Sequence, residues 1–357
     1  MNFTQTYEAV ALTVASGAVP LIIGESGIGK TALIRSFSQD MGLFLVTVDA
    51  NLLKEGEIGG LPTVTAGKTF YATHHKLAQI EEYLEAHENG CLLFIDEINR
   101  CDHAVQQELM NLILNREING YQLSPRVVVA AAMNPPPRMD SLGETRYQVV
   151  EMDPAQENRF VWLPMDSDPK EWIVWGMGEG AIHPQVLEFI GMFPESLHEV
   201  SKEEGRYATP RSWERISRAL WTLEDSAFKE EALYHFVRGN VGPARAQDFL
   251  GFRADQKNAL PSAQEVLGEE QISQWTKDAL AQASHSRRWI FVMNLFRAAQ
   301  EKPTPQTLQR VAQVLLLMPK DLRLSLMRDL RRSFYEDLYP ALLAQELFLE
   351  AFYESFR

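Results

Sequence analysis

The sequence predicts an α/β fold: a parallel sheet with helices on both faces, followed by regions that are helical throughout. Three observations predict it. A glycine-rich loop within Leu21–Thr31 connects an apolar run to an amphipathic segment. A second apolar run, Cys91–Ile95, is continuous, which is typical of a strand buried on both faces of a parallel sheet. From about Asp166 onward the apolar spacing is helical, with Pro and Gly breaks.

The length allows more than one core. With 357 residues, we expect an α/β core at residues 1–165 and two helical regions, at residues 166–255 and 256–357. The formal net charge of −14 argues against a general nucleic-acid binder, because phosphate contacts need clustered Lys and Arg. A local basic pore in an assembly stays possible.

Cysteine usage and the N-terminus indicate the compartment. Cys91 and Cys101 provide no disulfide framework and suit a reducing environment. The first residues lack the basic and apolar regions of a signal peptide, and the longest apolar run, Val127–Met133, is too short to span a bilayer. We therefore expect a soluble, cytoplasmic protein.

The glycine-rich loop fits the pattern G-x-x-x-x-G-K-[ST]. Such a loop points its backbone N–H groups at an anion, and glycine is needed where φ is positive or where a side chain would block the phosphates. Lys30 is predicted to contact the β- and γ-phosphates of a nucleoside triphosphate such as ATP, and the Thr31 hydroxyl to ligate Mg²⁺. The expected core is the αβα sandwich of P-loop NTPases. The predicted nucleotide-binding residues are Gly24, Glu25, Ser26, Gly27, Ile28, Gly29, Lys30 and Thr31.

Apolar spacing and turn residues predict the other elements of the first domain. Up to the acidic strand end we expect a helix over residues 1–17, a strand over 42–50, a helix broken by a small hairpin within 51–75, and a helix over 76–87. Beyond it we expect a helix over 103–117, a hairpin turned at Asn119-Gly120, a strand over 127–132 and a long loop from Arg138.

Two adjacent carboxylates, Asp96 and Glu97, follow the strand at Cys91–Ile95. The carboxyl ends of parallel strands are where doubly wound sheets bind ligands. We predict that Asp96 holds Mg²⁺ through water and that Glu97 orients and activates the attacking water. Their position, about 65 residues after the glycine-rich loop, suits a nucleotide site.

The strand over 127–132 delivers Asn134 to the same sheet edge. A polar amide there could fix the attacking water against the γ-phosphate. The alternative is a capping or turn Asn before the proline run that starts at Pro135.

A helix in the second half begins at Thr209, its predicted N-cap, with Pro210 at the first helical position. Arg211 then lies in the first turn, where a cation opposes the helix dipole. A cation there is more plausibly directed at an anion outside the helix. Pairing with a nearby carboxylate is the alternative. Further helix starts are predicted at Ser262, Ser286 and Thr304.

These motifs, in this order, resemble the AAA+ ATPases and, within them, the MoxR branch. GESGIGKT at Gly24–Thr31 resembles Walker A, CLLFIDEINR at Cys91–Arg100 resembles Walker B, and AAAMNPP at Ala130–Pro136 resembles the sensor 1 strand. The segment Asn51–Tyr71 resembles the helix-2 insert of that branch. The resemblance covers about residues 1–250, and the tail matches no motif.

The resemblance implies roles for three further side chains. Asn134 would be the sensor of the sensor 1 strand, and Arg211 in TPRSWERIS the sensor 2 arginine. Arg159 would be the arginine finger, although its segment reads ENRF where DRF is usual. The loop also differs, since Glu25 and Ser26 stand where small residues or proline are common.

The resemblance also implies partners. Such proteins form hexameric rings and often act with a partner that carries a von Willebrand factor A domain with a D-x-S-x-S metal site. No such string occurs in this chain, so that partner would be a separate protein. The implied activity is ATP hydrolysis, with Mg²⁺, that remodels or assembles a protein client.

Two functions from different classes stay open. The first is a ring ATPase that hydrolyses ATP to remodel a client; the second is a nucleotide-dependent switch or scaffold in defence or signalling. A nucleic-acid translocase is disfavoured by the charge. Hydrolysis is favoured because a pure binder would not need water-activating and trans-acting groups, here Glu97, Asn134, Arg159 and Arg211.

Overall fold

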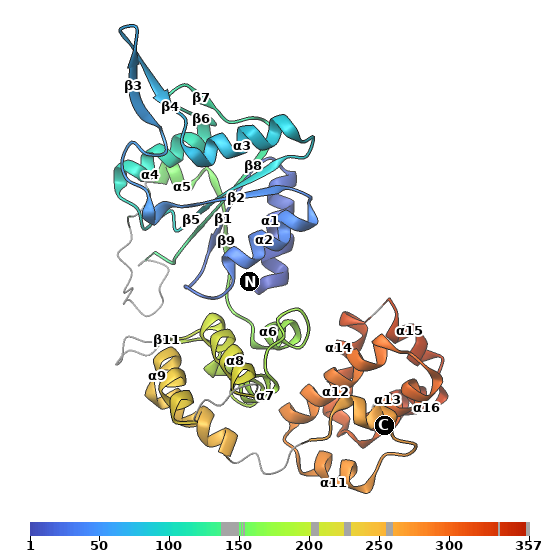
Figure 1. The fold of residues 1–357 in the computed structure, drawn as a ribbon. Helices are drawn as coiled ribbons and strands as arrows, with labels where there is room; N and C mark the ends of the chain where they lie inside the picture. The colour runs from blue at the N-terminus through green and yellow to red at the C-terminus, as the bar shows by residue number, and fades with distance from the viewer. Residues whose placement is uncertain are drawn as a thin grey trace. The chain divides into compact units, whose positions relative to one another are not determined.

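The computed structural model describes residues 1–136, 150, 152, 154–200, 207–224, 230–254, 260–334 and 336–354. The chain divides into two compact units, Met1–Asp168 and Pro169–Arg357. Figure 1 shows a sheet with flanking helices in the first unit and helices almost throughout the second. Most of the long loop predicted from Arg138 lies outside the described residues.

The first unit is built on five parallel strands in the order β2-β5-β8-β1-β9. Because β5, β8 and β1 are neighbours, the segments that follow their carboxyl ends meet at one edge of the sheet. These segments are the acidic strand end, Asn134 and the glycine-rich loop. The strand bounds are β1 (Val19–Ile23), β2 (Phe44–Asp49), β5 (Cys91–Asp96), β8 (Val127–Met133) and β9 (Phe160–Pro164).

Helices cover both faces of this sheet, as Figure 1 shows. Alternate residues of the buried strands point to opposite cores, so a continuous apolar run is needed to fill both. On one face Ile22 and Phe94 pack with α1 (Phe3–Ala15) and α2 (Lys30–Asp40). On the other face Leu21, Leu93 and Ile95 pack with α3 (His75–Ala86) and α4 (His103–Met110). The predicted αβα sandwich is confirmed.

Both predicted hairpins are present. β3 (Leu61–Thr65) and β4 (Lys68–Ala72) are joined at Ala66-Gly67, where φ is +50° and +75°. They form the two-stranded ribbon that extends from the unit in Figure 1. β6 (Glu117–Ile118) and β7 (Tyr121–Gln122) are joined at Asn119-Gly120, where φ is +48° and +84°. Positive φ at both central residues is the type I′ geometry that matches strand twist.

The helix predicted before the first hairpin was wrong. Residues 51–60 contain only the end of a 3₁₀ turn, Ala50–Leu52, followed by turns. Gly56 and Gly60 have φ of +80° and +86°, which an α-helix cannot accommodate. A side chain on Gly60 would also collide with the Ala72 carbonyl, 2.1 Å from an added Cβ.

The helix predicted over 103–117 ends two residues early. α4 gives way to a wide π-type turn at Asn111–Asn115, and Arg116 is left-handed with φ of +57°. The Arg116 guanidinium donates to the carbonyls of Ser124 and Val127, both at 2.7 Å. These contacts tie the end of the helix to the start of β8.

The second unit packs its helices around one hydrophobic core. α9 is broken at Gly242, where φ is +82° and ψ is +166°. Buried Asp329 links three of the helices, because it accepts from Lys170 Nζ and from Trp289 Nε1, both at 2.9 Å. β10 (Glu199–Val200) pairs antiparallel with β11 (Tyr207–Ala208).

The helices of the second unit are α6 (Pro169–Gly176), α7 (Pro184–Met192), α8 (Pro210–Glu224), α9 (Glu230–Ala254), α10 (Ala263–Gly268), α11 (Gln274–Gln282), α12 (His285–Glu301), α13 (Pro305–Leu317), α14 (Lys320–Ser333), α15 (Leu338–Leu343) and α16 (Glu346–Glu354). In the described part of the chain, none of the helices has the length and apolar character needed to cross a membrane.

Candidate active site

The glycine-rich loop follows β1 and ends where α2 begins. Gly27 and Gly29 have φ of +84° and +108°, a region that L side chains rarely adopt. A Cβ on Gly24 would lie 2.6 Å from the Met165 carbonyl oxygen, so any larger residue would displace the backbone. The loop therefore keeps this shape only with glycine at these positions, and the N-terminus of α2 adds a positive dipole end.

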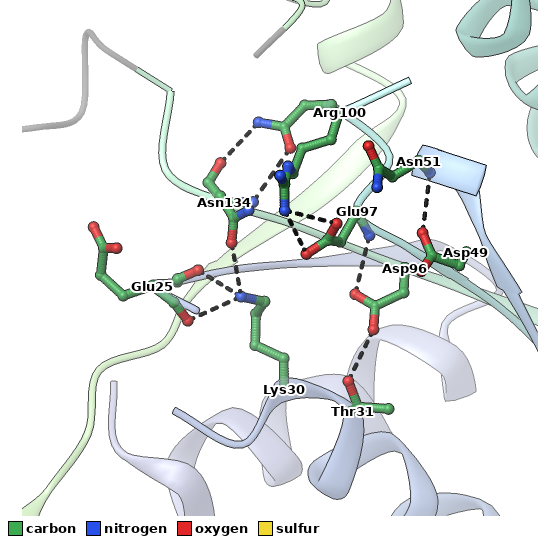
Figure 2. Close-up of polar contacts among 11 residues, drawn as sticks. Glu25, Lys30, Thr31, Asp49, Asn51, Asp96, Glu97, Arg100 and Asn134 are labelled. Atoms are coloured by element: carbon green, nitrogen blue, oxygen red, sulfur yellow. Dashed lines mark hydrogen bonds and ion pairs between the residues drawn. The ribbon is translucent and has the colours of Figure 1, made fainter. Parts of the chain in front are cut away.

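Lys30, the first residue of α2, is 8% exposed. Its Nζ donates to the carbonyl oxygens of Gly24 at 2.6 Å and Glu25 at 3.0 Å, and to Asn134 Oδ1 at 3.2 Å (Figure 2). The loop and the end of β8 thus converge on one buried ammonium group. A phosphate oxygen is the kind of acceptor that can replace a carbonyl here, because a charged acceptor binds an ammonium more strongly.

Thr31 and Asp96 place two oxygen groups together. Thr31 Oγ1 donates to Asp96 Oδ2 at 2.8 Å, and the other oxygen, Oδ1, accepts from the backbone N–H of Glu97 at 3.0 Å. The residues that the structure describes include no cluster of three or more His, Cys, Asp or Glu that could hold a metal alone. A hydroxyl and one carboxylate suit Mg²⁺, which binds through few protein oxygens, several waters and substrate phosphates.

Glu97 adopts an uncommon backbone conformation, with φ of +54°. Its carboxylate accepts from Arg100 Nη1 at both oxygens, Oε1 at 3.1 Å and Oε2 at 2.9 Å. Figure 2 shows this pair between Asp96 and Asn134. Non-glycine residues in left-handed backbone cluster at functional sites, because the surrounding structure must hold them there.

Asn134 is 1% exposed, and its Oδ1 accepts from Lys30. Its Nδ2 is buried and has no hydrogen-bond partner among the described residues. An unsatisfied buried donor costs about 1–3 kcal/mol, which an acceptor such as a phosphate oxygen or a water would recover. The contact with Lys30 favours a role for Asn134 in the candidate site over a role as a capping or turn residue. The donors Lys30 Nζ and Asn134 Nδ2 fit a bound nucleotide.

Arg159 lies at the amino ends of the strands, whereas the glycine-rich loop lies at their carboxyl ends. It precedes Phe160, the first residue of β9, which pairs with Val19, the first residue of β1. The loop instead follows Ile23, the last residue of β1, about five residues or roughly 16 Å further along the strands. The side chain of Arg159 is exposed. The structure does not bring Arg159 to the loop of its own chain.

Arg211 lies in the first turn of α8, as predicted. The predicted cap is present, because Thr209 Oγ1 accepts from the backbone N–H of Ser212 at 3.2 Å. The Arg211 side chain is exposed. It belongs to the second unit, and the loop belongs to the first.

Sequence reasoning missed two residues of the site. Arg100 holds the Glu97 carboxylate, and Asn99 bonds the backbone of Asn134. Both belong to the string DEINR, which the sequence analysis used only as a family resemblance. The spacing of three residues between the opposite charges of Glu97 and Arg100 could have indicated their ion pair.

Comparison with known proteins agrees with this geometry. Residues 20–152 match the family described as "ATPase family associated with various cellular activities (AAA)". BssE of Thauera aromatica, provisionally named a chaperone, is 27% identical over 159 residues, which cover 42% of this chain and 51% of that protein. The chain therefore spans about half the length of the curated relative it matches.

Solved structures with a similar fold are more distant. A point mutant of RuvB from Thermotoga maritima is 17% identical, with a TM-score of 0.38 over 74% of this chain and 73% of that chain. NtrX from Brucella abortus is 16% identical, with a TM-score of 0.40 over 92% and 67%.

The segment that matches the family contains the loop, the acidic strand end and Asn134. Residues 20–152 of this chain are therefore similar to the AAA ATPase family in the part that forms the candidate site.

Proposed function

We propose that this chain is a ring-forming AAA+ ATPase of the MoxR branch, which hydrolyses ATP to remodel or assemble a protein client. The observation that carries the proposal is the convergence of Lys30, Thr31, Asp96, Glu97 and Asn134 at one edge of the sheet. The name of the relative BssE, which describes it as a chaperone, supports a protein client.

In this proposal the loop and Lys30 bind the phosphates. The N–H groups of the loop and of the first turn of α2 face the β- and γ-phosphates. Lys30 exchanges its contacts with the Gly24 and Glu25 carbonyls for phosphate oxygens, which is favourable because both partners are then charged. Thr31 and Asp96 would hold Mg²⁺, Asp96 through water, and the ion would supply positive charge against the phosphates.

Glu97 and Asn134 act on the water. Glu97 orients the attacking water and accepts its proton, and Arg100 competes with that water for the same two oxygens. The unpartnered Nδ2 of Asn134 donates to the γ-phosphate or to that water. A buried donor that gains an acceptor as charge develops lowers the barrier, because it needs no reorganisation at that moment.

The position of Arg159 supports action between subunits. An exposed arginine at the far edge of the sheet is available to the γ-phosphate of a neighbour. A head-to-tail contact of that kind closes into a ring when the rotation per subunit suits it, and we propose a hexamer. Residues 166–255 would then be the lid that carries Arg211, and residues 256–357 an extension. A partner with a von Willebrand factor A domain would be a separate protein.

The proposal is tested by ATP turnover of the purified protein with Mg²⁺, compared with Glu97→Gln. Glu97→Gln should retain ATP binding and lose hydrolysis, because the carboxylate acts on water only in the transition state. Normal hydrolysis by Glu97→Gln would contradict the assignment. A Glu97→Gln protein that retains full biological activity would instead favour a nucleotide-dependent switch.

A further inference from the structure

The Asn99 side chain forms a two-point contact with one residue of another strand. Asn99 is 2% exposed. Its Nδ2 donates to the backbone carbonyl of Asn134 at 2.9 Å, and its Oδ1 accepts from the backbone N–H of Asn134 at 3.3 Å. The primary amide thus pairs with Asn134 as a peptide group of a neighbouring strand would.

The local sequence explains why a side chain is needed there. Beyond the paired residues of β5 and β8, the N–H of Ile98 still donates to the Ala132 carbonyl at 3.1 Å. Asn134 directly follows Met133, the last residue of β8, and Pro135 and Pro136 after it have no N–H to continue a ladder. Asn99 supplies the pairing that the backbone cannot supply at this point.

Asn99 is itself held firmly. Its carbonyl accepts from the N–H of Val150 at 2.8 Å, and the carbonyl of the preceding residue, Ile98, accepts from Gln106 Nε2 at 3.4 Å. On the other side of β8, the N–H of Gly24 donates to the Met133 carbonyl at 3.2 Å. The end of β8 is therefore fixed between the glycine-rich loop and Asn99.

We propose that Asn99 is a positioning residue for ATP hydrolysis, which fixes Asn134 relative to Lys30 and Glu97. The inference rests on the proposed function. Asn99 acts only through Asn134: its two side-chain polar atoms are used on the Asn134 backbone. The short segment Asp96–Asn99 then carries three functions. Asp96 is the proposed Mg²⁺ ligand, Glu97 activates the water, and the Asn99 amide positions Asn134.

The test uses Asn99→Asp, which keeps the shape of the side chain. The carboxylate still accepts from the Asn134 N–H, but it places an oxygen against the Asn134 carbonyl where Nδ2 donated, so attraction becomes repulsion. The matched control is Asn115→Asp, at an exposed residue whose Nδ2 donates to Asn111 Oδ1 at 3.2 Å. Asn134→Ala and the double variant Asn99→Asp/Asn134→Ala complete the set.

We expect Asn99→Asp to lower kcat roughly 10- to 100-fold, the range for a misplaced transition-state donor, while ADP affinity changes less than about threefold. The control should match the unmodified protein. The double variant should be no slower than Asn134→Ala alone, because a residue that acts only through Asn134 has nothing left to position. Rates are normalised to the number of ADP sites, which counts folded protein.

Two results would overturn the inference while leaving the proposed function intact. One is a kcat of Asn99→Asp within about twofold of the unmodified protein, and the other is a double variant whose loss is the product of the two single losses. Absence of turnover in the unmodified protein would overturn both proposals. Asn99→Ala introduces no buried charge and gives the same comparison if Asn99→Asp does not fold.

Discussion

The Arg100 guanidinium holds both oxygens of the Glu97 carboxylate through one nitrogen, at 3.1 and 2.9 Å. Their side chains are 36% and 25% exposed. Ion pairs this accessible to water contribute about 1 kcal/mol at most. The contact therefore fixes the direction of the carboxylate and adds little to the stability of the fold.

Arg100→Ala should release this restraint. We expect kcat for ATP without a client to rise two- to fivefold, since about 1 kcal/mol is about fivefold in rate, and KM to stay unchanged. Steady-state ATPase assays measure both values. Arg100→Lys keeps the charge and should give an intermediate rate. A fall in kcat beyond fivefold would mean that Arg100 holds Glu97 in its working position.

Subunit mixing tests whether Arg159 acts on a neighbour. Arg159→Ala and Lys30→Ala should each be inactive, since a trans-acting arginine is worth about 10³ to 10⁵ in rate. In mixed rings some interfaces pair an intact loop with an intact Arg159, so activity should reappear on mixing. Arg331→Ala, at an exposed arginine of α14, is the control and should be fully active. A fully active monomer that resists dilution would refute the ring.

Arg211 should distinguish ATP from ADP. If it contacts the γ-phosphate, Arg211→Ala weakens binding of a non-hydrolysable ATP analogue about tenfold and leaves ADP binding unchanged. Titration of each nucleotide gives the two dissociation constants. Arg215→Ala, one turn further along α8 and also exposed, is the control. Equal affinities for the analogue in Arg211→Ala and unmodified protein would leave pairing with a carboxylate as the explanation.

The two thiols should be inert in the folded protein. Burial raises the pKa of the Cys101 thiol to about 11 and raises the pKa of Cys91 as well. Because the thiolate is the reactive form, little of it exists at pH 8 and reagents reach it slowly. We expect a thiol reagent to modify both cysteines at once in urea and neither in native buffer over the same time. Rapid native reaction of either cysteine would show that its surroundings in the first unit open.

Much of the first unit could be predicted because its signals are local. β5 is a continuous apolar run, and both type I′ turns are marked by a residue pair that ends in glycine. The helix predicted after Asn51 was wrong because Gly56 and Gly60 adopt positive φ, which an α-helix cannot accommodate.

The predicted start of a helix was less accurate where two similar residues could both act as its N-cap. Ser286 was predicted to begin a helix, but Ser284 is the cap of α12, because its side chain accepts from the Arg287 N–H at 3.3 Å. Ser262 caps α10 as predicted. Two serines two residues apart carry the same local signal, so the sequence alone does not distinguish them.

In the candidate site, residues with a fixed motif spacing were predicted and those defined by contacts across strands were not. Lys30 and Asp96 follow from the loop pattern and the acidic strand end. The pairing of Asn99 with Asn134 depends on the register between β5 and β8, which no single stretch of sequence contains.

The register of β9 against β1 gives the sheet the role of a spacer in the proposed ring. Arg159 stands at one end of β9, and the loop stands beyond the other end of β1, so strand length sets how far apart a subunit holds the two nucleotides it serves. Two residues added to β9 would preserve which faces are buried, because side chains alternate with a period of two. They would nevertheless shift the arginine by roughly 7 Å. The length of the strands in one subunit therefore sets the spacing between neighbouring nucleotide sites at which subunits can cooperate.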